Sequence, residues 1–289
     1  MKIKHVLWVA GLAALAGCAA VDRPSNQSNG PVDGQVIARQ HAMLAQNTST
    51  KGFGPQSPRD IDSGAGTNSR AHSAAPASNR MNLCNVHFHK NAEHKGEEFS
   101  KHAGHGDGQG NEAGYLYSGQ LSPSELQPVD GQICAGKQGG LATGDTIEAH
   151  YVYSSAQVKP GPTLGACLSD AIKNPQLRVE TQVYVLVNDK NAQDFGHLTR
   201  HELQNGVHQA VNIPADTGDP VQYAGSTTGP TYNEIGSPFQ VTWSVRPKVA
   251  KVNIASVGAW CQGNVFKEDH AHGVRNLVVH PDLLSAIEQ

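Results

Sequence analysis

Alternation of apolar and polar residues recurs along the chain and predicts its architecture. Four segments alternate over the length of a strand: residues 146–153, 179–187, 239–245 and 249–255. A period of two is typical of β-strands that bury one face. Helical periodicity is scarce, and only residues 195–203 and the segment after Pro281 indicate short helices. We therefore predict a mainly β (α+β) fold around a large twisted, mostly antiparallel sheet with few short helices.

The N-terminal residues indicate an exported lipoprotein. Lys2 and Lys4 precede an apolar run, residues 6–15, which is typical of a signal peptide and too short to span a membrane as a mature helix. The run ends in Leu15-Ala-Gly-Cys18, which resembles a bacterial lipoprotein signal. We expect residues 1–17 to be removed and Cys18 to carry the lipid, at the periplasmic side of the outer membrane or at the cell surface. An ordinary secretory signal cleaved nearby is the alternative.

The next segment, residues 18–80, is rich in Ser, Asn, Gln, Pro, Gly and Ala and has few large apolar residues. Such a composition cannot bury enough surface to offset the entropy of ordering, so we predict a disordered tether. Residues 81–289 then form one domain, since about 200 residues suffice for a substantial core.

Charge and cysteine content narrow the choice of partners and of compartment. The formal net charge is -3, and no basic run predicts nucleic-acid binding, so the lipid anchor is the only membrane contact we expect. Four cysteines follow Cys18, and an even number in an exported chain predicts two disulfides with three possible pairings. We favour Cys84–Cys134 with Cys167–Cys261. Nothing in the sequence predicts the oligomeric state.

Two short stretches carry metal-binding potential. In an extended strand, His87 and His89 point to the same face about 7 Å apart, and their imidazoles can share one metal ion. Zn²⁺ takes nitrogen ligands at about 2.0–2.1 Å. In the strand 146–153, Glu148 and His150 share a face, so the carboxylate can accept the free ring N–H of a metal-binding histidine. Each stretch alone is also compatible with a polar strand face, because the chain has fifteen histidines.

A third stretch, Tyr223-Ala-Gly-Ser-Thr-Thr-Gly-Pro230, is a turn-rich loop that precedes Val241-Thr-Trp243. In this order the motifs resemble the carbonic anhydrases. The α class carries Gln-x-His-x-His, Glu-His, Glu-x-His, Tyr-x-Gly-Ser-x-Thr-Thr-Pro-Pro and Val-Thr-Trp. The compact stretch 85–94 (NVHFHKNAEH) and residues 266–275 (FKEDHAHGVR) resemble the δ class more closely. The resemblance covers roughly residues 82–280.

The resemblance implies an α-carbonic-anhydrase-like sheet and reversible hydration of CO₂ to bicarbonate and a proton. It implies that His87, His89 and His150 hold a catalytic Zn²⁺, with Co²⁺ or Cd²⁺ as possible substitutes. Asn85 and Glu148 would accept hydrogen bonds from His87 and His150.

The resemblance also implies a threonine that donates to Glu93 and orients the nucleophile. Thr228 is the expected residue, but Thr227 stays open because the loop lacks one residue of the α-class pattern and has Gly229 in place of a threonine or proline. The expected CO₂ pocket consists of Val152, Val183, Val185 and Trp243. The proton-shuttle candidates are His94, His102, His105, His270 and His272, and for His94 we favour a structural hydrogen-bonding role.

Two other functions compete with this interpretation. The spacing His87-x-His89-x₃-Glu93 also fits a cupin, in which Glu93 would bind the metal directly. Met81 stands where a cupin has glycine, however, and Gly96 comes too early. The second alternative is a non-catalytic zinc-binding envelope lipoprotein on the same scaffold, which the presence of all three expected ligands disfavours.

Overall fold

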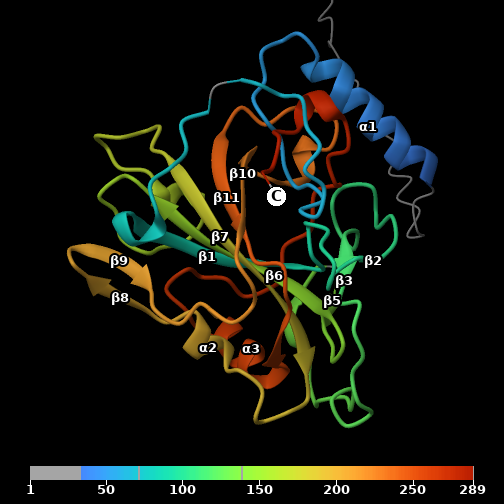
Figure 1. Cartoon of the computed structure of the whole chain (residues 1–289). Helices are drawn as coiled ribbons and strands as arrows, with labels where there is room; N and C mark the ends of the chain where they lie inside the picture. The colour runs from blue at the N-terminus through green and yellow to red at the C-terminus, as the bar shows by residue number, and fades with distance from the viewer. Residues whose placement is uncertain (1–33, 71, 138, 289) are drawn as a thin grey trace, which may run out of the picture.

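The central sheet dominates a computed structural model that describes residues 34–70, 72–137 and 139–288. Within these residues the strand order is β1-β6-β7-β11-β10, and β12 also pairs with β7. Strand β7 runs parallel to β11 and β12, and the other pairs are antiparallel. The sheet is visibly twisted (Figure 1), and the predicted mainly β fold with few helices is confirmed, although the sheet is mixed, with three antiparallel and two parallel pairs. Its strands are β1 (Asn82–Lys90), β6 (Thr146–Ser154), β7 (Leu177–Val187), β10 (Val221–Ser226), β11 (Gln240–Val245) and β12 (Ala250–Asn253).

The remaining elements are short, apart from helix α1 with 15 residues. The small strands are β2 (Lys101–His102), β3 (Tyr115–Leu116), β4 (Ile133–Gly136), β5 (Gly139–Leu141), β8 (His201–Gln204) and β9 (Val207–Ala210). The helices are α1 (Gly34–Thr48), α2 (Phe195–Leu198) and α3 (Ile254–Cys261), with 3-10 turns η1 (Ser78–Arg80), η2 (Leu164–Cys167), η3 (Pro230–Tyr232) and η4 (Pro281–Leu283).

Two segments, each predicted as a single element, contain both a helix and a strand. The predicted helix 195–203 ends after α2, and β8 follows. Asn205 and Gly206 both have positive φ, which is the turn that an Asn-Gly pair makes between hairpin strands, here β8 and β9. The predicted strand 249–255 likewise ends at Asn253, whose side chain caps α3 by accepting from the Ala255 N–H.

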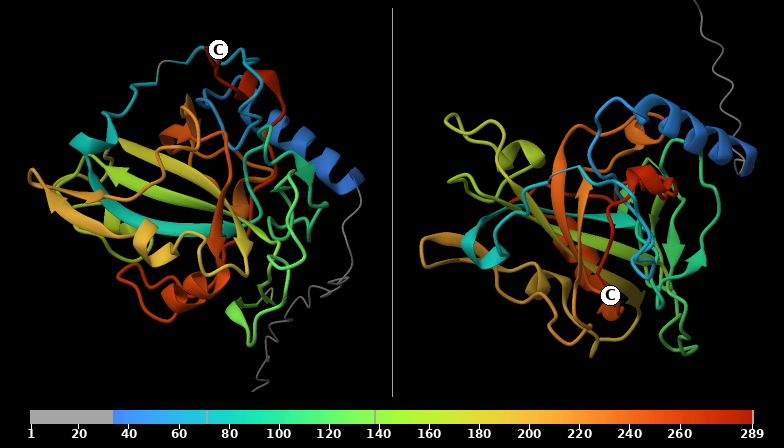
Figure 2. Two further views of the ribbon diagram at one scale, coloured as in Figure 1. Left: turned by 60° about the horizontal axis from the view of Figure 1, so that its bottom comes forward. Right: turned by 45° about the horizontal axis from the view of Figure 1, so that its top comes forward.

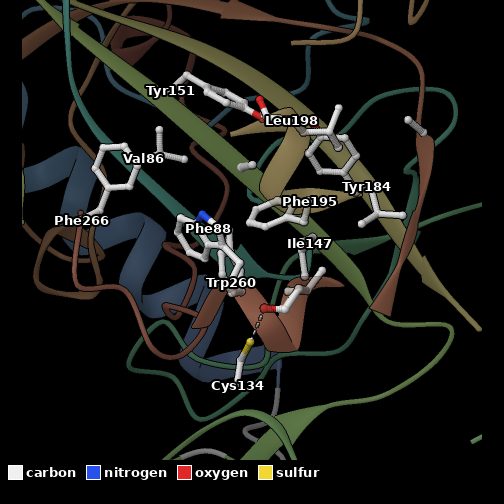
Figure 3. Close-up of a cluster of buried hydrophobic side chains, with 14 of the residues drawn as sticks. Val86, Phe88, Cys134, Ile147, Tyr151, Tyr184, Phe195, Leu198, Trp260 and Phe266 are labelled. Atoms are coloured by element: carbon white, nitrogen blue, oxygen red, sulfur yellow. Dashed lines mark hydrogen bonds between the residues drawn. The ribbon is translucent and has the colours of Figure 1, made fainter. Parts of the chain in front are cut away.

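Both faces of the sheet carry apolar clusters, but one of them, which we call the polar face, also carries the buried polar side chains of β1 and β6. On the other face, Phe88 of β1, Tyr151 of β6 and Tyr184 of β7 pack against Phe195 of α2 and Trp260 of α3 (Figure 3). Figure 2 shows α2 and α3 together on one side of the sheet and α1 away from them. The packing against α2 and α3 therefore fixes the positions of β1 and β6, and the polar side chains of these two strands lie on the opposite face of the sheet.

The prediction of two disulfides is confirmed, but the predicted pairing is wrong. The bonds are Cys84–Cys167 and Cys134–Cys261. Cys84 and Cys167 belong to the apolar cluster on the polar side of the sheet, whereas Cys134 packs with the cluster beneath α3. A Cys84–Cys134 bond would have to join two separate apolar clusters, and strand alternation alone cannot show which loops return to which cluster.

The predicted tether is wrong for residues 34–80, which pack on the domain. Helix α1 contributes Leu44 to a small cluster with Val278 and Leu283 of the C-terminal segment. Arg59 is fully buried and donates to the carbonyls of Ser63 and Ala65. Arg59 also donates to the carbonyl of Ser285 in the C-terminal segment, so hydrogen bonds to backbone groups help to order this part of the chain, a contribution that its low apolar content does not reveal. The predicted signal peptide, Cys18 and the rest of residues 18–33 lie outside the described residues.

A search of the described residues for a membrane-spanning helix finds none of sufficient length and apolar character.

Candidate metal centre

Three histidines converge on the polar face of the sheet, from two neighbouring strands. In the register of β1 and β6, His87 lies directly opposite His150, and His89 lies two residues further along β1. The ring centroids are 5.1 Å apart for His87 and His150, 5.3 Å for His87 and His89, and 4.7 Å for His89 and His150. The period of two and the antiparallel register together place all three rings at one point.

One nitrogen of each ring is fixed by an acceptor that lies away from this point. His87 Nδ1 is 2.7 Å from Asn85 Oδ1, and His150 Nε2 is 2.7 Å from Glu148 Oε1. His89 Nδ1 is 2.7 Å from the carbonyl oxygen of Gly273. Because all three partners are acceptors, each of these nitrogens carries the proton. The other nitrogen of each ring therefore carries a lone pair.

The three lone pairs face one another. His87 Nε2 and His150 Nδ1 are 3.3 Å apart, with no proton left to lie between them. His89 Nε2 is buried and has no hydrogen-bond partner. Two nitrogens that each bind zinc at about 2.0–2.1 Å in tetrahedral geometry are roughly 3.3–3.4 Å apart. The arrangement fits a cation shared by the three rings, since mutually facing lone pairs otherwise repel.

Burial favours the neutral imidazoles that such a cation requires. Burial, together with the nearby His150 and His89, holds the pKa of His87 well below its usual value, and burial lowers the pKa of His89 to about 4. Burial also lowers the pKa of His150, although the hydrogen bond to Glu148 opposes the shift. Metal binding needs unprotonated histidine, so no proton has to be removed from these rings near neutral pH.

Glu148 is the centre of a buried hydrogen-bond network. Besides His150 it accepts from the backbone N–H of His94 at 3.1 Å and from His94 Nδ1 at 2.7 Å. His94 Nε2 in turn lies 2.6 Å from the Tyr223 hydroxyl, which donates to it. Burial alone would raise the pKa of Glu148, but His94 and His150 lower it. With no exposed surface and both ring nitrogens bonded, His94 has the surroundings of a structural residue.

Glu93 lies beside the histidines and is held from two sides. The Thr228 hydroxyl donates to Glu93 Oε2 at 3.0 Å, and the Arg275 backbone N–H donates to Oε1 at 3.1 Å. The Thr227 hydroxyl lies instead 2.8 Å from the Ser237 hydroxyl. Of the two threonines left open by the sequence, Thr228 is the one that contacts Glu93.

A second group of potential ligands, Glu93, Glu148 and His150, has a different character. Its oxygens already accept the hydrogen bonds described above, and the His150 nitrogen that faces them is the protonated one. Glu93 also faces the protonated Nδ1 of His89, at 3.6 Å. The direct Glu93 ligand that a cupin would use is therefore not favoured.

A cavity of about 910 Å³ opens over the three histidines. Of the four residues expected to form a CO₂ pocket, Val152 and Trp243 line this cavity, and Val183 and Val185 do not. Both of these are fully buried further along β7, where Val183 pairs with Glu148 beneath the site. The β7 residues that line the cavity are Leu177 and Val179, and Val179 lies opposite Val152 in the register. Only the strand register, which the sequence does not contain, distinguishes these valines.

The five proton-shuttle candidates lie in three different places. His270 and His272 line the cavity, and His94 is buried behind the site. His102 and His105 contact each other edge to face and are not part of the lining. The rings of His270 and His272 are 5.6 Å apart, and that of His272 is 5.4 Å from His87. A hydrogen bond to Glu268 raises the pKa of His272.

Comparison with known proteins identifies a family whose model matches this chain. A family model described as delta carbonic anhydrase matches residues 78–256. None of the curated proteins compared with the chain matches it.

The chain is also similar to solved structures. The α-carbonic anhydrase of Thermovibrio ammonificans, in complex with sulfanilamide, is 16% identical, with 76% of this chain and 83% of that chain covered and a TM-score of 0.26. The α-carbonic anhydrase of Photobacterium profundum is 15% identical, with 83% and 92% covered and a TM-score of 0.26. A hyperthermostable carbonic anhydrase from a hydrothermal vent chimney is 14% identical, with 78% and 86% covered and a TM-score of 0.27.

Proposed function

The chain belongs to the delta carbonic anhydrase family, and we propose that it hydrates CO₂ reversibly to bicarbonate and a proton, using a zinc ion held by His87, His89 and His150. The observation that supports this most strongly is the set of three facing lone pairs, with the unpartnered Nε2 of His89 among them. Three imidazole nitrogens are the protein ligand set of a catalytic zinc site that leaves one position for the reacting species.

A zinc ion at these nitrogens would supply a Lewis acid that makes water nucleophilic at neutral pH, a chemistry for which carbonic anhydrases are the standard example. Imidazole ligands discriminate weakly among divalent cations, so Co²⁺ or Cd²⁺ could replace zinc in this proposal. Asn85, Glu148 and the Gly273 carbonyl hold the three rings in the tautomers that leave the inner nitrogens unprotonated.

Thr228 orients the attacking oxygen in this proposal. Its only proton goes to Glu93, so its oxygen can act only as an acceptor towards the reacting group. An O–H that donates to Thr228 has its lone pair directed elsewhere, towards the apolar wall. That wall includes Val152, Val179 and Trp243, and it suits CO₂ because the substrate has no net dipole and no hydrogen-bond donor.

Removing His150 tests the function itself. We expect the wild-type protein to bind one zinc ion and to hydrate CO₂, and a chelator to abolish the activity until zinc is returned. His150→Ala should lose both tight zinc binding and activity, since the remaining two imidazoles leave the ion under-coordinated. The measurements are metal content by mass spectrometry and CO₂ hydration by stopped flow. A folded wild-type protein that holds zinc without hydrating CO₂ would instead support a non-catalytic zinc-binding role.

The two adjacent threonines form a matched pair. Thr228→Ala should lower kcat/KM for CO₂ hydration by about 10²-fold with zinc content unchanged, because the nucleophile loses a preorganised hydrogen bond. Thr227→Ala, which removes a hydroxyl bonded to Ser237, should change kcat/KM only a few-fold. Equal losses in the two variants would contradict the role of Thr228.

His270 is the proton shuttle that the cavity supports best. It lines the cavity, its side chain is 47% exposed, and its ring contacts that of His272, which in turn contacts His87. His270→Ala should lower kcat by roughly 10²-fold in weak buffer and leave kcat/KM unchanged, because proton release follows CO₂ hydration. Imidazole buffer should restore kcat. His102→Ala, outside the cavity lining, serves as the control, and a kcat for His270→Ala that equals that of the control would exclude His270.

A further inference from the structure

The Asn85 side chain controls which nitrogen of His87 carries the proton. An amide has an acceptor end and a donor end, and only its oxygen can accept from His87 Nδ1. If the amide turned over, its NH₂ group would face Nδ1, and the ring proton would have to move to Nε2. Nε2 is the nitrogen that faces His150 in the metal centre, and a protonated nitrogen cannot bind a metal ion.

A single carbonyl group fixes the direction of this amide. Asn85 Nδ2 donates to the carbonyl oxygen of Gly161 at 3.1 Å, which leaves Oδ1 to face His87 at 2.7 Å. Because the carbonyl is an acceptor only, it excludes the inverted amide. Gly161 lies between Pro160 and Pro162, and the residue before a proline is restricted to extended backbone, so the carbonyl has little freedom of its own.

The segment that carries this carbonyl touches the domain at few points. Residues 155–176 connect β6 to β7, and among residues 157–176, all of them described, only Gly161 and Cys167 are buried. The Gly161 N–H donates to the Cys84 carbonyl at 3.0 Å, and the Cys167 carbonyl accepts from the Ser154 hydroxyl at 2.7 Å. Cys167 is also bonded covalently to Cys84, the neighbour of Asn85 in β1.

We propose that the Cys84–Cys167 disulfide and the Gly161 carbonyl together form a positioning device that sets the tautomer of His87 and thereby the metal affinity of the site. The inference rests on the proposed metal centre. A connection of this length has a large conformational entropy, and the disulfide confines it close to Asn85. Without the bond, the Gly161 carbonyl leaves Asn85 for part of the time and the amide is free to turn.

The second disulfide provides a matched control. Cys84→Ala/Cys167→Ala should bind zinc about 10- to 100-fold more weakly than wild type, the loss typical of a disturbed partner of a metal ligand. Cys134→Ala/Cys261→Ala removes a disulfide that also borders the cavity through Cys134, but neither cysteine adjoins a hydrogen-bond partner of the three histidines, so the zinc affinity should change only a few-fold. Competition with a chromophoric chelator measures both. Thr163 and Leu164 of the same connection line the cavity, so catalytic activity would not separate the two effects.

The tautomer can be read directly in the metal-free protein by ¹⁵N NMR of the histidine rings. We expect wild type and the Cys134/Cys261 variant to show His87 protonated at Nδ1 alone, and the Cys84/Cys167 variant to show a mixture of tautomers. A single Nδ1-protonated form in the Cys84/Cys167 variant, or equal loss of zinc affinity in both disulfide variants, would overturn the proposal.

A second substitution in the Cys84/Cys167 variant distinguishes an effect on the His87 tautomer from a general loss of order around the site. A carboxylate has no donor end, so adding Asn85→Asp to the Cys84/Cys167 variant should restore the Nδ1 tautomer and most of the zinc affinity. Failure of this rescue in a folded protein would contradict the proposal.

If the double alanine variant does not fold, two variants that keep the disulfide decide the question. Asn85→Asp should keep the single tautomer, and Asn85→Ala should lose it; a single tautomer in Asn85→Ala would overturn the proposal. A wild-type protein that binds no zinc would instead contradict the proposed function. The NMR measurement on the metal-free protein would still show whether the disulfide and the Gly161 carbonyl set the tautomer of His87.

Discussion

The mutual approach of three imidazole lone pairs is the constraint on which the site depends. Each lone pair faces inward because the opposite nitrogen donates to a fixed acceptor: an amide oxygen, a backbone carbonyl or a carboxylate. Such an arrangement is unfavourable for the protein alone, since the lone pairs repel and His89 Nε2 has no partner. The packing and hydrogen bonds of the rest of the fold hold the rings together against this repulsion, and a bound cation would remove the repulsion.

Two features of the fold hold the three rings together: the packed core on the opposite face of the sheet and a hydrogen-bond network around the site. Phe88 and Tyr151 anchor β1 and β6 in the core under α2 and α3, so the strands cannot slide or tilt to separate the rings. On the polar side, Glu148 is shared by His150 and His94, and His94 is fixed by Tyr223 of β10. Through His94, the network connects Glu148 of β6 with Tyr223 of β10.

The pairs of polar residues that share a strand face could be predicted from the sequence because their geometry is local, whereas the approach of His150 to the other two histidines depends on the register of β1 with β6 and was implied only by the family resemblance. His87 and His89, and likewise Glu148 and His150, share a face through strand periodicity alone, and Asn85 follows the same rule. The partners that depend on distant chain segments could not be found in this way. The Gly273 carbonyl leaves no sequence signal because any residue has one, and Val179 differs from Val183 only through the register of β7 with β6. The order of residues 34–80 was also hidden, because hydrogen bonds to backbone groups, such as that from Arg59 to the Ser285 carbonyl, help to hold this segment and leave no apolar pattern in the sequence.

X-ray absorption spectroscopy of the zinc-loaded protein tests the central claim most directly. The account predicts a four-coordinate ion with three imidazole nitrogens at about 2.0–2.1 Å and one further light ligand atom, without sulfur. A spectrum with two imidazoles or fewer, or with a carboxylate in place of one of them, would contradict the convergence of His87, His89 and His150 on a single cation.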